Sequence, residues 1–340
     1  MNGSSENVIF NPDGAGKWEI QLRGELKDVP TDIFQSPTPW KNLWGEPILV
    51  GAVNHAEFFV HDEITPVFIK IKPKGRPTII VGERSPHLVG GVNFRDIGGY
   101  RTVDGKYTNW GQVYRSGHLS NLTSIDKEKI EQRGIRTIID FRSLEESSNE
   151  KTDPLKDTRL CVIGIPPGIG DKRYFHRLFA SNVEPAPILE AMHHMFVALI
   201  RDYATYFQAF FKILLEDSDG ALLLNCSAGK ERTGTGVALF LSALDVPIAT
   251  IMYDFMLSER YYPIESEIPR ALEKYEVSLP GPEGRRLIMP LLETRRSYIE
   301  VIFDTIVNDH GSVSSFLEEK CGVGVNEKRR LRELYTNCTV

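Results

Sequence analysis

The stretch that most constrains the fold is residues 223–234, which read LLNCSAGKERTG. The apolar run ALLLN at 221–225 predicts a buried strand, and the largely apolar residues 233–244 predict a buried helix. A strand that ends in a tight loop before a helix brings backbone N–H groups together at the positive end of the helix dipole. The sequence therefore predicts an anion cradle between this strand and this helix.

Two residues in this loop point to chemistry on a phosphate. Cys226 and Arg232 are separated by five residues, which is enough chain to wrap once around a phosphate. The sulfur would then lie below the phosphorus, while the planar guanidinium reaches two oxygens. The amides and the dipole favour the thiolate, which can displace a leaving group and form a phosphocysteine that water hydrolyses. We expect the phosphate to be bound by Ser227, Ala228, Gly229, Lys230, Glu231, Arg232 and Thr233, with no metal, because the amides and Arg232 stabilise the charge.

This loop has two other interpretations, a structural role and a nucleotide-binding role. Cys226 can be read as a buried structural cysteine, with Arg232 as a surface residue. A nucleotide-binding Walker loop is excluded on spacing, because Leu224 stands where that motif needs a glycine.

Hydrolysis also needs a proton for the leaving oxygen, so a general acid is expected. Asp140 ends the predicted strand 136–140, and sites in parallel sheets gather at the carboxyl ends of strands. Glu231 lies inside the loop itself. We expect both at the site, with Asp140 as a partner of Arg232 or Arg142 as the alternative. For Asp96, between Arg95 and two nearby glycines, a turn role is favoured.

From about residue 92 the pattern alternates between strands and helices, which predicts an α/β fold with a mainly parallel central sheet flanked by helices. The expected strands are 136–140, 160–165 and 221–225, and the expected helices are 124–133, 188–215, 233–244 and one around 299–306.

The first part of the chain has a different pattern. Short β-favouring runs recur at 18–22, 48–53, 57–60, 66–71 and 77–81, and turn residues separate them at 11–14, 37–39 and 72–75. This spacing is typical of a small β-sandwich, with an immunoglobulin-like one expected. We therefore predict two domains, a β-rich one at residues 1–85 and a catalytic one at 86–340.

Composition excludes several classes of protein. The chain is 41% hydrophobic and 25% charged, as in ordinary globular proteins, and its net charge of −6 argues against nucleic-acid binding. The four cysteines form no CxxC pair and are widely spaced, which favours free thiols. The N-terminus has neither a basic start nor an apolar run, so we expect no signal peptide, no membrane segment and a cytoplasmic location, unless a leader has been removed.

Several blocks of the sequence resemble one family. NCSAGKERTG at 225–234 is similar to the pattern HCxxGKDRTG of the bacterial and fungal tyrosine phosphatase-like family, which includes the mycobacterial secreted phosphatase B group. NFRDIGGY at 93–100, VYRSGHLSNLT at 113–123, GIRTIIDFRSLEE at 134–146 and DFMLSERYY at 254–262 are similar to other blocks of that family. The resemblance runs from about Leu88 to the C-terminus. It implies a cysteine-phosphatase fold, and a β-rich N-terminal extension occurs in several bacterial relatives.

The resemblance also implies substrates. We expect phosphotyrosine proteins, with phosphoserine, phosphothreonine or phosphoinositides as further substrates; a lysine at the position of Lys230 is associated in such phosphatases with phosphoinositides. Two positions depart from the pattern, because Asn225 replaces its histidine and Glu231 its aspartate. Asn225 motivates a second hypothesis, a catalytically weak phosphate-binding module or pseudophosphatase. Further alternatives are arsenate reduction or sulfur transfer at Cys226, and a main role for residues 1–85 in docking a partner.

Overall fold

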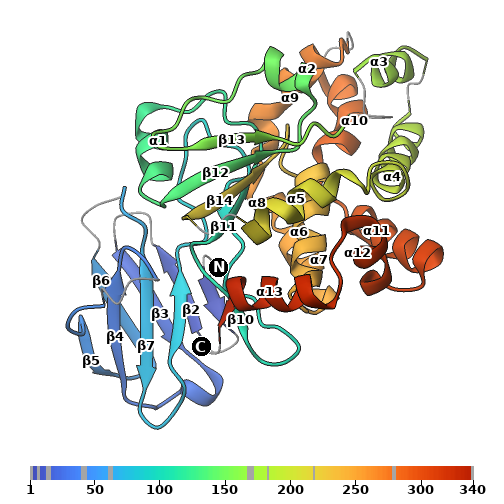
Figure 1. Cartoon of the computed structure of the whole chain (residues 1–340). Coiled ribbons are helices and arrows are strands. Elements are labelled where there is room, and N and C mark those ends of the chain that lie inside the picture. Colours follow the sequence, from blue (N-terminus) through green and yellow to red (C-terminus); the bar gives the residue numbers. More distant parts are fainter. Residues whose placement is uncertain are drawn as a thin grey trace.

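Two groups of secondary structure follow one another along the chain (Figure 1). The computed structural model describes residues 3–5, 8–12, 17–39, 44–59, 64–166, 172–181, 184–216, 219–277 and 281–337. Up to Gly82 it contains strands and one short 3-10 helix, and beyond that point helices and strands mix. The prediction of a mixed α/β chain is confirmed.

The strands before Gly82 form two antiparallel four-stranded sheets. One has the order β1 (Gly3–Ser5), β2 (Val8–Pro12), β3 (Lys17–Leu22) and β6 (His55–Phe59). The other has the order β5 (Leu49–Ala52), β4 (Thr31–Ser36), β7 (Phe68–Pro73) and β8 (Ile79–Gly82). The short helix Gly24–Leu26 lies between β3 and β4.

Both sheets contribute to one hydrophobic cluster. In β3 the buried residues alternate with partly exposed ones, the period expected of a strand with one face against a core. Trp18 and Ile20 from this strand share the cluster with Ile33 and Ile69 of the other sheet. The runs predicted at 18–22, 48–53, 57–60, 66–71 and 77–81 overlap β3, β5, β6, β7 and β8, whereas β1, β2 and β4 were not predicted. Val60, Asp13 and Gly14 lie outside the described residues.

A five-stranded sheet forms the centre of the second group. Its order is β13 (Arg159–Val162), β12 (Ile135–Asp140), β14 (Ala221–Asn225), β11 (Val113–Ser116) and β9 (Arg95–Asp96). The first four strands are parallel, and β9 is antiparallel to β11. All five residues of β14 are buried, as its unbroken apolar run predicts for a strand covered on both faces. A separate two-stranded pair joins β10 (Tyr107–Thr108) to β15 (Thr336–Asn337).

Helices cover both faces of this sheet. On one face Ile130 of α1 (Ser124–Glu131) packs in a cluster with Ile138 of β12 and Leu223 of β14. On the other face Leu222 and Leu224 belong to a larger cluster with helices that include α4 (Ala186–Arg201), α5 (Tyr206–Glu216), α6 (Glu231–Ala243), α7 (Ile248–Met256) and α11 (Arg296–His310). The remaining helices are α2 (Leu144–Asn149), α3 (Lys172–Ser181), α8 (Ser258–Tyr261), α9 (Ile264–Lys274), α10 (Gly281–Leu292), α12 (Val313–Cys321) and α13 (Val325–Tyr335).

The single helix expected over 188–215 is wrong, because the structure has two. α4 ends at Arg201 and α5 begins at Tyr206. Between them the amide of Tyr203 donates to the carbonyl of Ala198, five residues back, which interrupts the regular helical ladder. Apolar residues on both sides of the break gave one continuous pattern, so periodicity alone did not reveal it.

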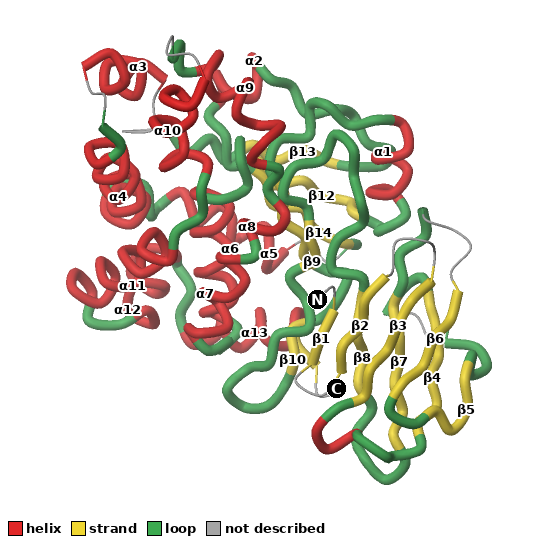
Figure 2. Tube along the Cα trace, turned by 180° about the vertical axis from the view of Figure 1, so that it is seen from behind, coloured by secondary structure: helices red, strands yellow, loops and turns green. Residues whose placement is uncertain are grey.

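A small set of contacts joins the two groups, which lie side by side in the view of Figure 2. The guanidinium of Arg84 donates to the carbonyls of Asp96 (2.8 Å) and Gly98 (2.9 Å) and lies over the rings of Tyr100 and Trp110. Trp110 in turn packs in a cluster with Trp44 and Phe68 and donates its indole N–H to the carbonyl of Ile80 at 3.1 Å. The first group is therefore packed against β9 and the loop that follows it.

Three of the four cysteines lie in the described residues, and Cys161, Cys226 and Cys321 are free thiols, as predicted. Cys338 lies outside the described residues. Burial raises the pKa of the Cys321 thiol to about 12, which makes that residue unreactive. No helix among the described residues has the length and apolar character of a transmembrane span.

Candidate active site

The loop between β14 and α6 curves tightly around the sulfur of Cys226. The sulfur is buried, and the amide of Gly229 donates to Sγ at 3.2 Å. Gly229 has a φ of 69°, and a Cβ at this position would lie 2.4 Å from the carbonyl oxygen of Ser116. Only glycine satisfies both the left-handed backbone and this close approach. The predicted strand–loop–helix is therefore present, with the sulfur facing a loop amide.

Neighbouring segments hold the carbonyls of this loop outward. The amide of His118 donates to the carbonyl of Ser227 at 2.9 Å. The side-chain amide of Asn93 donates to the carbonyls of Ala228 (3.2 Å) and Gly229 (3.0 Å). Because the N–H and C=O of a peptide unit point in opposite directions, the amides that follow these carbonyls face the inside of the loop. Such converging amides form an anion-binding concavity.

A network of buried charged residues also holds the Gly229 carbonyl of this loop in place. The guanidinium of Arg115 donates to the carbonyl of Gly229 at 2.7 Å and to the carboxylate of Asp254 at 2.5 Å. Asp254 also accepts from Arg95 (3.3 Å) and from the hydroxyl of Tyr100 (2.9 Å). Burial acts to raise the pKa of Asp254, but the two arginines and Tyr100 outweigh it and lower the pKa to about 2. Asp254 therefore stays ionised and keeps both guanidinium groups in place.

Asp96 has the turn role that the sequence predicts. Its carboxylate accepts from the amides of Gly98 (2.7 Å) and Gly111 (2.6 Å), and it is fully buried. Burial raises the pKa of Asp96 to about 7, with the nearby Arg84 and the two amides opposing the shift.

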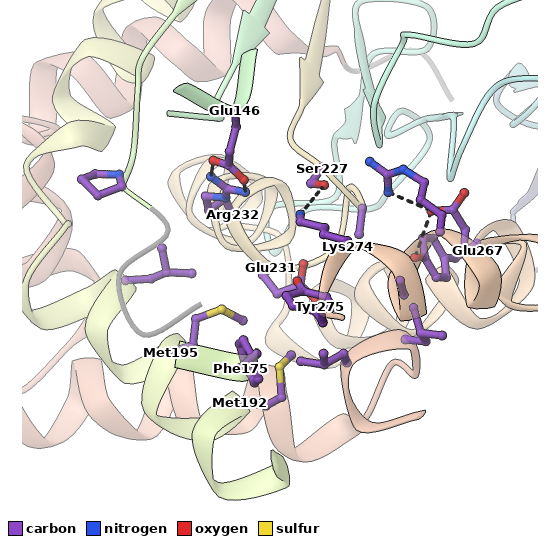
Figure 3. Close-up of a pocket in the computed structure, with 18 of the residues that line it drawn as sticks. Glu146, Phe175, Met192, Met195, Ser227, Glu231, Arg232, Glu267, Lys274 and Tyr275 are labelled. Atoms are coloured by element: carbon purple, nitrogen blue, oxygen red, sulfur yellow. Dashed lines mark hydrogen bonds and ion pairs between the residues drawn. The ribbon is translucent and has the colours of Figure 1, made fainter. Parts of the chain in front are cut away.

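Arg232 lies at the start of α6 and is held by Glu146 of α2 (Figure 3). Nη1 donates to Oε2 at 2.6 Å and Nη2 donates to Oε1 at 2.9 Å. Burial acts to raise the pKa of Glu146, but the hydrogen bonds and charge of Arg232 lower it to about 2. The pKa of Arg232 is raised because this pairing outweighs its burial. The guanidinium is thus charged and oriented, and Nη1 also donates to the carbonyl of Ile165 at 3.3 Å, while Nε–H has no partner among the described residues.

Sequence reasoning did not identify Glu146 as a site residue. The sequence does place Glu146 three residues after Ser143, a spacing that indicates a capping box, and the two residues form one at the start of α2. That pattern explains the backbone geometry but does not show that the same carboxylate reaches the phosphate loop.

The structure corrects the expectation that Asp140 lies at the site. Its side chain is fully buried, and both carboxylate oxygens accept from the guanidinium of Arg142, at 2.7 Å to Nη2 and 3.0 Å to Nε. Arg142 also donates to the carbonyl of Glu150. Asp140 therefore orders the loop after β12, as in the alternative of an Arg142 partner, and is turned away from the pocket.

Lys230 also differs from its expected place. Its ammonium donates to the carbonyls of Leu291 (2.8 Å), Leu292 (2.6 Å) and Glu293 (3.3 Å), and it lies 4.4 Å from the centre of the Tyr262 ring. These carbonyls end α10, where a positive charge is favourable. Lys230 therefore fixes the end of a neighbouring helix instead of facing the pocket.

The pocket above the loop combines charged side chains with apolar walls. Ser227, Ala228, Glu231 and Arg232 line it from the loop, so four predicted residues are brought together here. Figure 3 shows Glu231 and Lys274 beside Arg232, with Phe175, Met192 and Met195 on the far side. α9 contributes Glu267, Arg270, Ala271 and Lys274, which follow the i, i+3, i+4, i+7 spacing of one helical face.

Two buried polar side chains at the loop lack a partner among the described residues. The hydroxyl of Thr233 accepts and donates no hydrogen bond within that part of the chain. The same holds for both polar atoms of the side chain of Asn225, the residue before Cys226. A buried hydroxyl that is free to turn is suited to bond a thiolate as it forms, whereas the Asn225 amide is unsatisfied.

Comparison with known proteins agrees with this geometry. The sequence profile of the tyrosine phosphatase family matches residues 86–337. A Cupriavidus necator protein whose name places it among tyrosine-protein phosphatases is 28% identical over 246 residues, which is 70% of this chain and 84% of the relative. The triple specificity protein phosphatase PtpB of Mycobacterium tuberculosis is 25% identical over 273 residues, which is 72% of this chain and 96% of the relative. A tyrosine-protein phosphatase of Nostoc commune is 25% identical over 147 residues, covering 43% of this chain and 48% of the relative.

The match covers most of the chain and includes the loop, Glu146 of α2 and the α9 face that together build the pocket. The chain therefore belongs to the tyrosine phosphatase family and is a phosphatase of the hydrolase class.

Proposed function

We propose that this chain hydrolyses phosphotyrosine through a phosphocysteine intermediate on Cys226. The observation that carries the proposal is the Gly229 amide 3.2 Å from Sγ, inside a loop whose carbonyls are held outward. A phosphate seated on those amides has its phosphorus above the sulfur. Arg232, already oriented by Glu146, supplies N–H groups to the phosphate oxygens.

In the first step the thiolate attacks phosphorus, the S–P bond forms and the bond to the tyrosine oxygen breaks. The leaving oxygen takes a proton from Glu231, which lines the pocket and is only partly buried. In the second step Glu231 takes a proton from water as the water oxygen attacks phosphorus. The P–S bond then breaks, inorganic phosphate leaves, and the hydroxyl of Thr233 donates to the returning thiolate.

The pocket walls support an aromatic leaving group. Phe175 and Tyr275 contact each other edge to face, with ring centres 5.6 Å apart, and both line the pocket beside two methionines. Aromatic and thioether surfaces suit a phenyl ring. One relative is named a triple specificity phosphatase, and the apolar area beside the loop would also admit phosphoserine, phosphothreonine or phosphoinositide substrates.

The two-domain division is part of the proposal. The family match begins at residue 86, directly after the two antiparallel sheets, and those sheets share one hydrophobic cluster. We assign residues 1–85 to an immunoglobulin-like sandwich that can dock a partner, and residues 86–340 to the cysteine-phosphatase domain with its mainly parallel sheet. Free thiols at Cys161 and Cys321 fit a reducing cytoplasm.

The second candidate is a weakly catalytic phosphate-binding module, which the unpartnered Asn225 favours. One experiment separates the two. Wild type, Cys226→Ser and Glu231→Gln are assayed with an aryl phosphate and a phosphotyrosine peptide in the presence of chelator. The enzyme hypothesis expects turnover by wild type, none by Cys226→Ser with phosphate binding retained, and a reduced rate for Glu231→Gln. Binding without turnover in wild type supports the module, and turnover by Cys226→Ser excludes the phosphocysteine route.

A further inference from the structure

Among the described residues, six charged side chains line the pocket, and five of these six are paired within it or beside it. Arg232 pairs with Glu146, and Arg270 pairs with both Glu150 (2.6 Å) and Glu267 (3.2 Å). Glu231 lies 3.8 Å from the ammonium of Lys230. The sixth is Lys274.

Lys274 has no such carboxylate partner. Its ammonium lies 3.5 Å from the hydroxyl of Ser227 and 5.5 Å from the centre of the Tyr275 ring, and no carboxylate in the described part of the chain lies within ion-pair distance. Its side chain is half-buried and lines the pocket. An unpaired, partly buried cation is a favourable contact for an anion that enters.

The position of Lys274 sets which anion it can reach. It follows Arg270 by one helical turn on the pocket face of α9, and its ammonium donates to the hydroxyl of Ser227, the residue next to Cys226. The scissile phosphate is already surrounded by the loop amides and Arg232. Figure 3 shows the Lys274 side chain reaching the edge of the loop at Ser227. Its ammonium is therefore placed beside the phosphate seat and not beneath it.

We propose that Lys274 forms an anion subsite that binds a carboxylate of the substrate peptide next to the phosphotyrosine. The inference rests on the proposed function. The substrate class is accordingly an acidic phosphopeptide, whose ring packs on the aromatic wall while a neighbouring Asp or Glu pairs with Lys274. The loop lysine Lys230 cannot supply this contact, because three backbone carbonyls bind its ammonium.

The test uses a panel of phosphotyrosine peptides in which a single Glu is moved from two residues before to two residues after the phosphotyrosine, each with a Gln twin and a Lys twin. Wild type, Lys274→Gln and Lys274→Glu are compared at low salt by KM and kcat. A matched control is Lys212→Gln, an exposed lysine on α5 that does not line the pocket.

We expect wild type to prefer at least one Glu peptide over its Gln twin by about fivefold in KM, the range of a partly exposed ion pair. Lys274→Gln should abolish this preference and leave the Gln peptides within about twofold of wild type, with Lys212→Gln unchanged. Lys274→Glu should invert the preference toward peptides that carry Lys at that position. Added salt should weaken the preference of wild type.

Two results overturn the subsite. One is a wild type that hydrolyses the peptides without preferring Glu at any position; the other is a Lys274→Gln variant that loses the same factor on every peptide, which would place Lys274 on the scissile phosphate or in the fold. A wild type that hydrolyses none of the peptides overturns the proposed function first, so the two failures are distinguishable.

Discussion

Arg232 and Glu146 form a two-point ion pair, with Nη1–Oε2 at 2.6 Å and Nη2–Oε1 at 2.9 Å, although the two residues are 86 positions apart. A guanidinium has five N–H donors, and this pairing takes one from each terminal nitrogen. Nη1 also donates to the carbonyl of Ile165 at 3.3 Å, so within the described residues Nε–H and the second N–H of Nη2 remain for a phosphate. In the proposed mechanism Glu146 is therefore a positioning residue for Arg232.

Glu146→Gln should lower kcat/KM by about tenfold, because a neutral amide cannot accept two charge-assisted hydrogen bonds and the guanidinium loses its fixed orientation. Steady-state kinetics with an aryl phosphate measure the effect. Glu145→Gln is the matched control, since Glu145 is exposed on the same helix. Equal kinetics for the two variants would contradict the role assigned to Glu146.

Gly229→Ala should lower kcat/KM by about a hundredfold or more, because displacement of a reacting group by about 1 Å has effects of this size. The added Cβ would meet the carbonyl oxygen of Ser116 at 2.4 Å and shift the amide that bonds Sγ. Gly311→Ala is the control, since Gly311 also has a positive φ, 75°, but open space around it. Activity should survive in Gly311→Ala; a similar loss in both variants would point to backbone strain alone.

Asp254→Asn should destabilise the protein by about 3–5 kcal/mol, because it leaves two buried guanidinium groups without their carboxylate. Urea unfolding at neutral pH measures this change. Asp309→Asn, which breaks an exposed pair with Arg201, should have a much smaller effect. Similar losses from the two variants would show that the buried network is not what stabilises the loop.

The same network predicts how stability depends on pH. The pKa of Asp254 is about 2 when folded, below its ordinary value of 3.8, so its contribution is present above pH 3.8 and is lost as pH falls toward 2. Wild type should therefore lose more free energy of unfolding than Asp254→Asn between pH 5 and about 2.5. Parallel urea curves at the two pH values test this expectation, and equal losses would contradict it.

Asn225→Leu should change the free energy of unfolding by less than about 1 kcal/mol or increase it, because an apolar side chain of similar size removes two unsatisfied polar atoms. Thermal and urea unfolding measure the change. Thr137→Leu on the neighbouring strand β12 is the comparison, since Thr137 is buried and has a bonding partner. Strong destabilisation by Asn225→Leu would mean that water or a ligand satisfies the amide.

Local patterns in the sequence predicted the elements around the site. The apolar run of β14 specifies a buried strand, and α1 begins at Ser124, where the helix expected over 124–133 starts. The same patterns missed the break between α4 and α5, and they missed β4, in which the polar residues Asp32 and Gln35 fall on opposite faces and interrupt the apolar alternation. A strand without regular apolar alternation is hard to recognise from its own sequence, because its neighbours in the sheet decide which of its residues are buried.

The amino-acid sequence by itself determined the loop from Cys226 to Arg232, because a strand, a glycine that accepts a positive φ and a helix start lie within twelve consecutive residues. Only the tertiary structure decided which charges serve that loop. It paired Asp140 with Arg142, bound Lys230 to the end of α10, and brought Glu146 and Lys274 to the pocket from distant helices. Ion pairs form between side chains that tertiary packing brings within a few ångströms of each other. Which side chains these are depends on how the helices pack across the sheet, and this packing cannot be predicted from local sequence patterns.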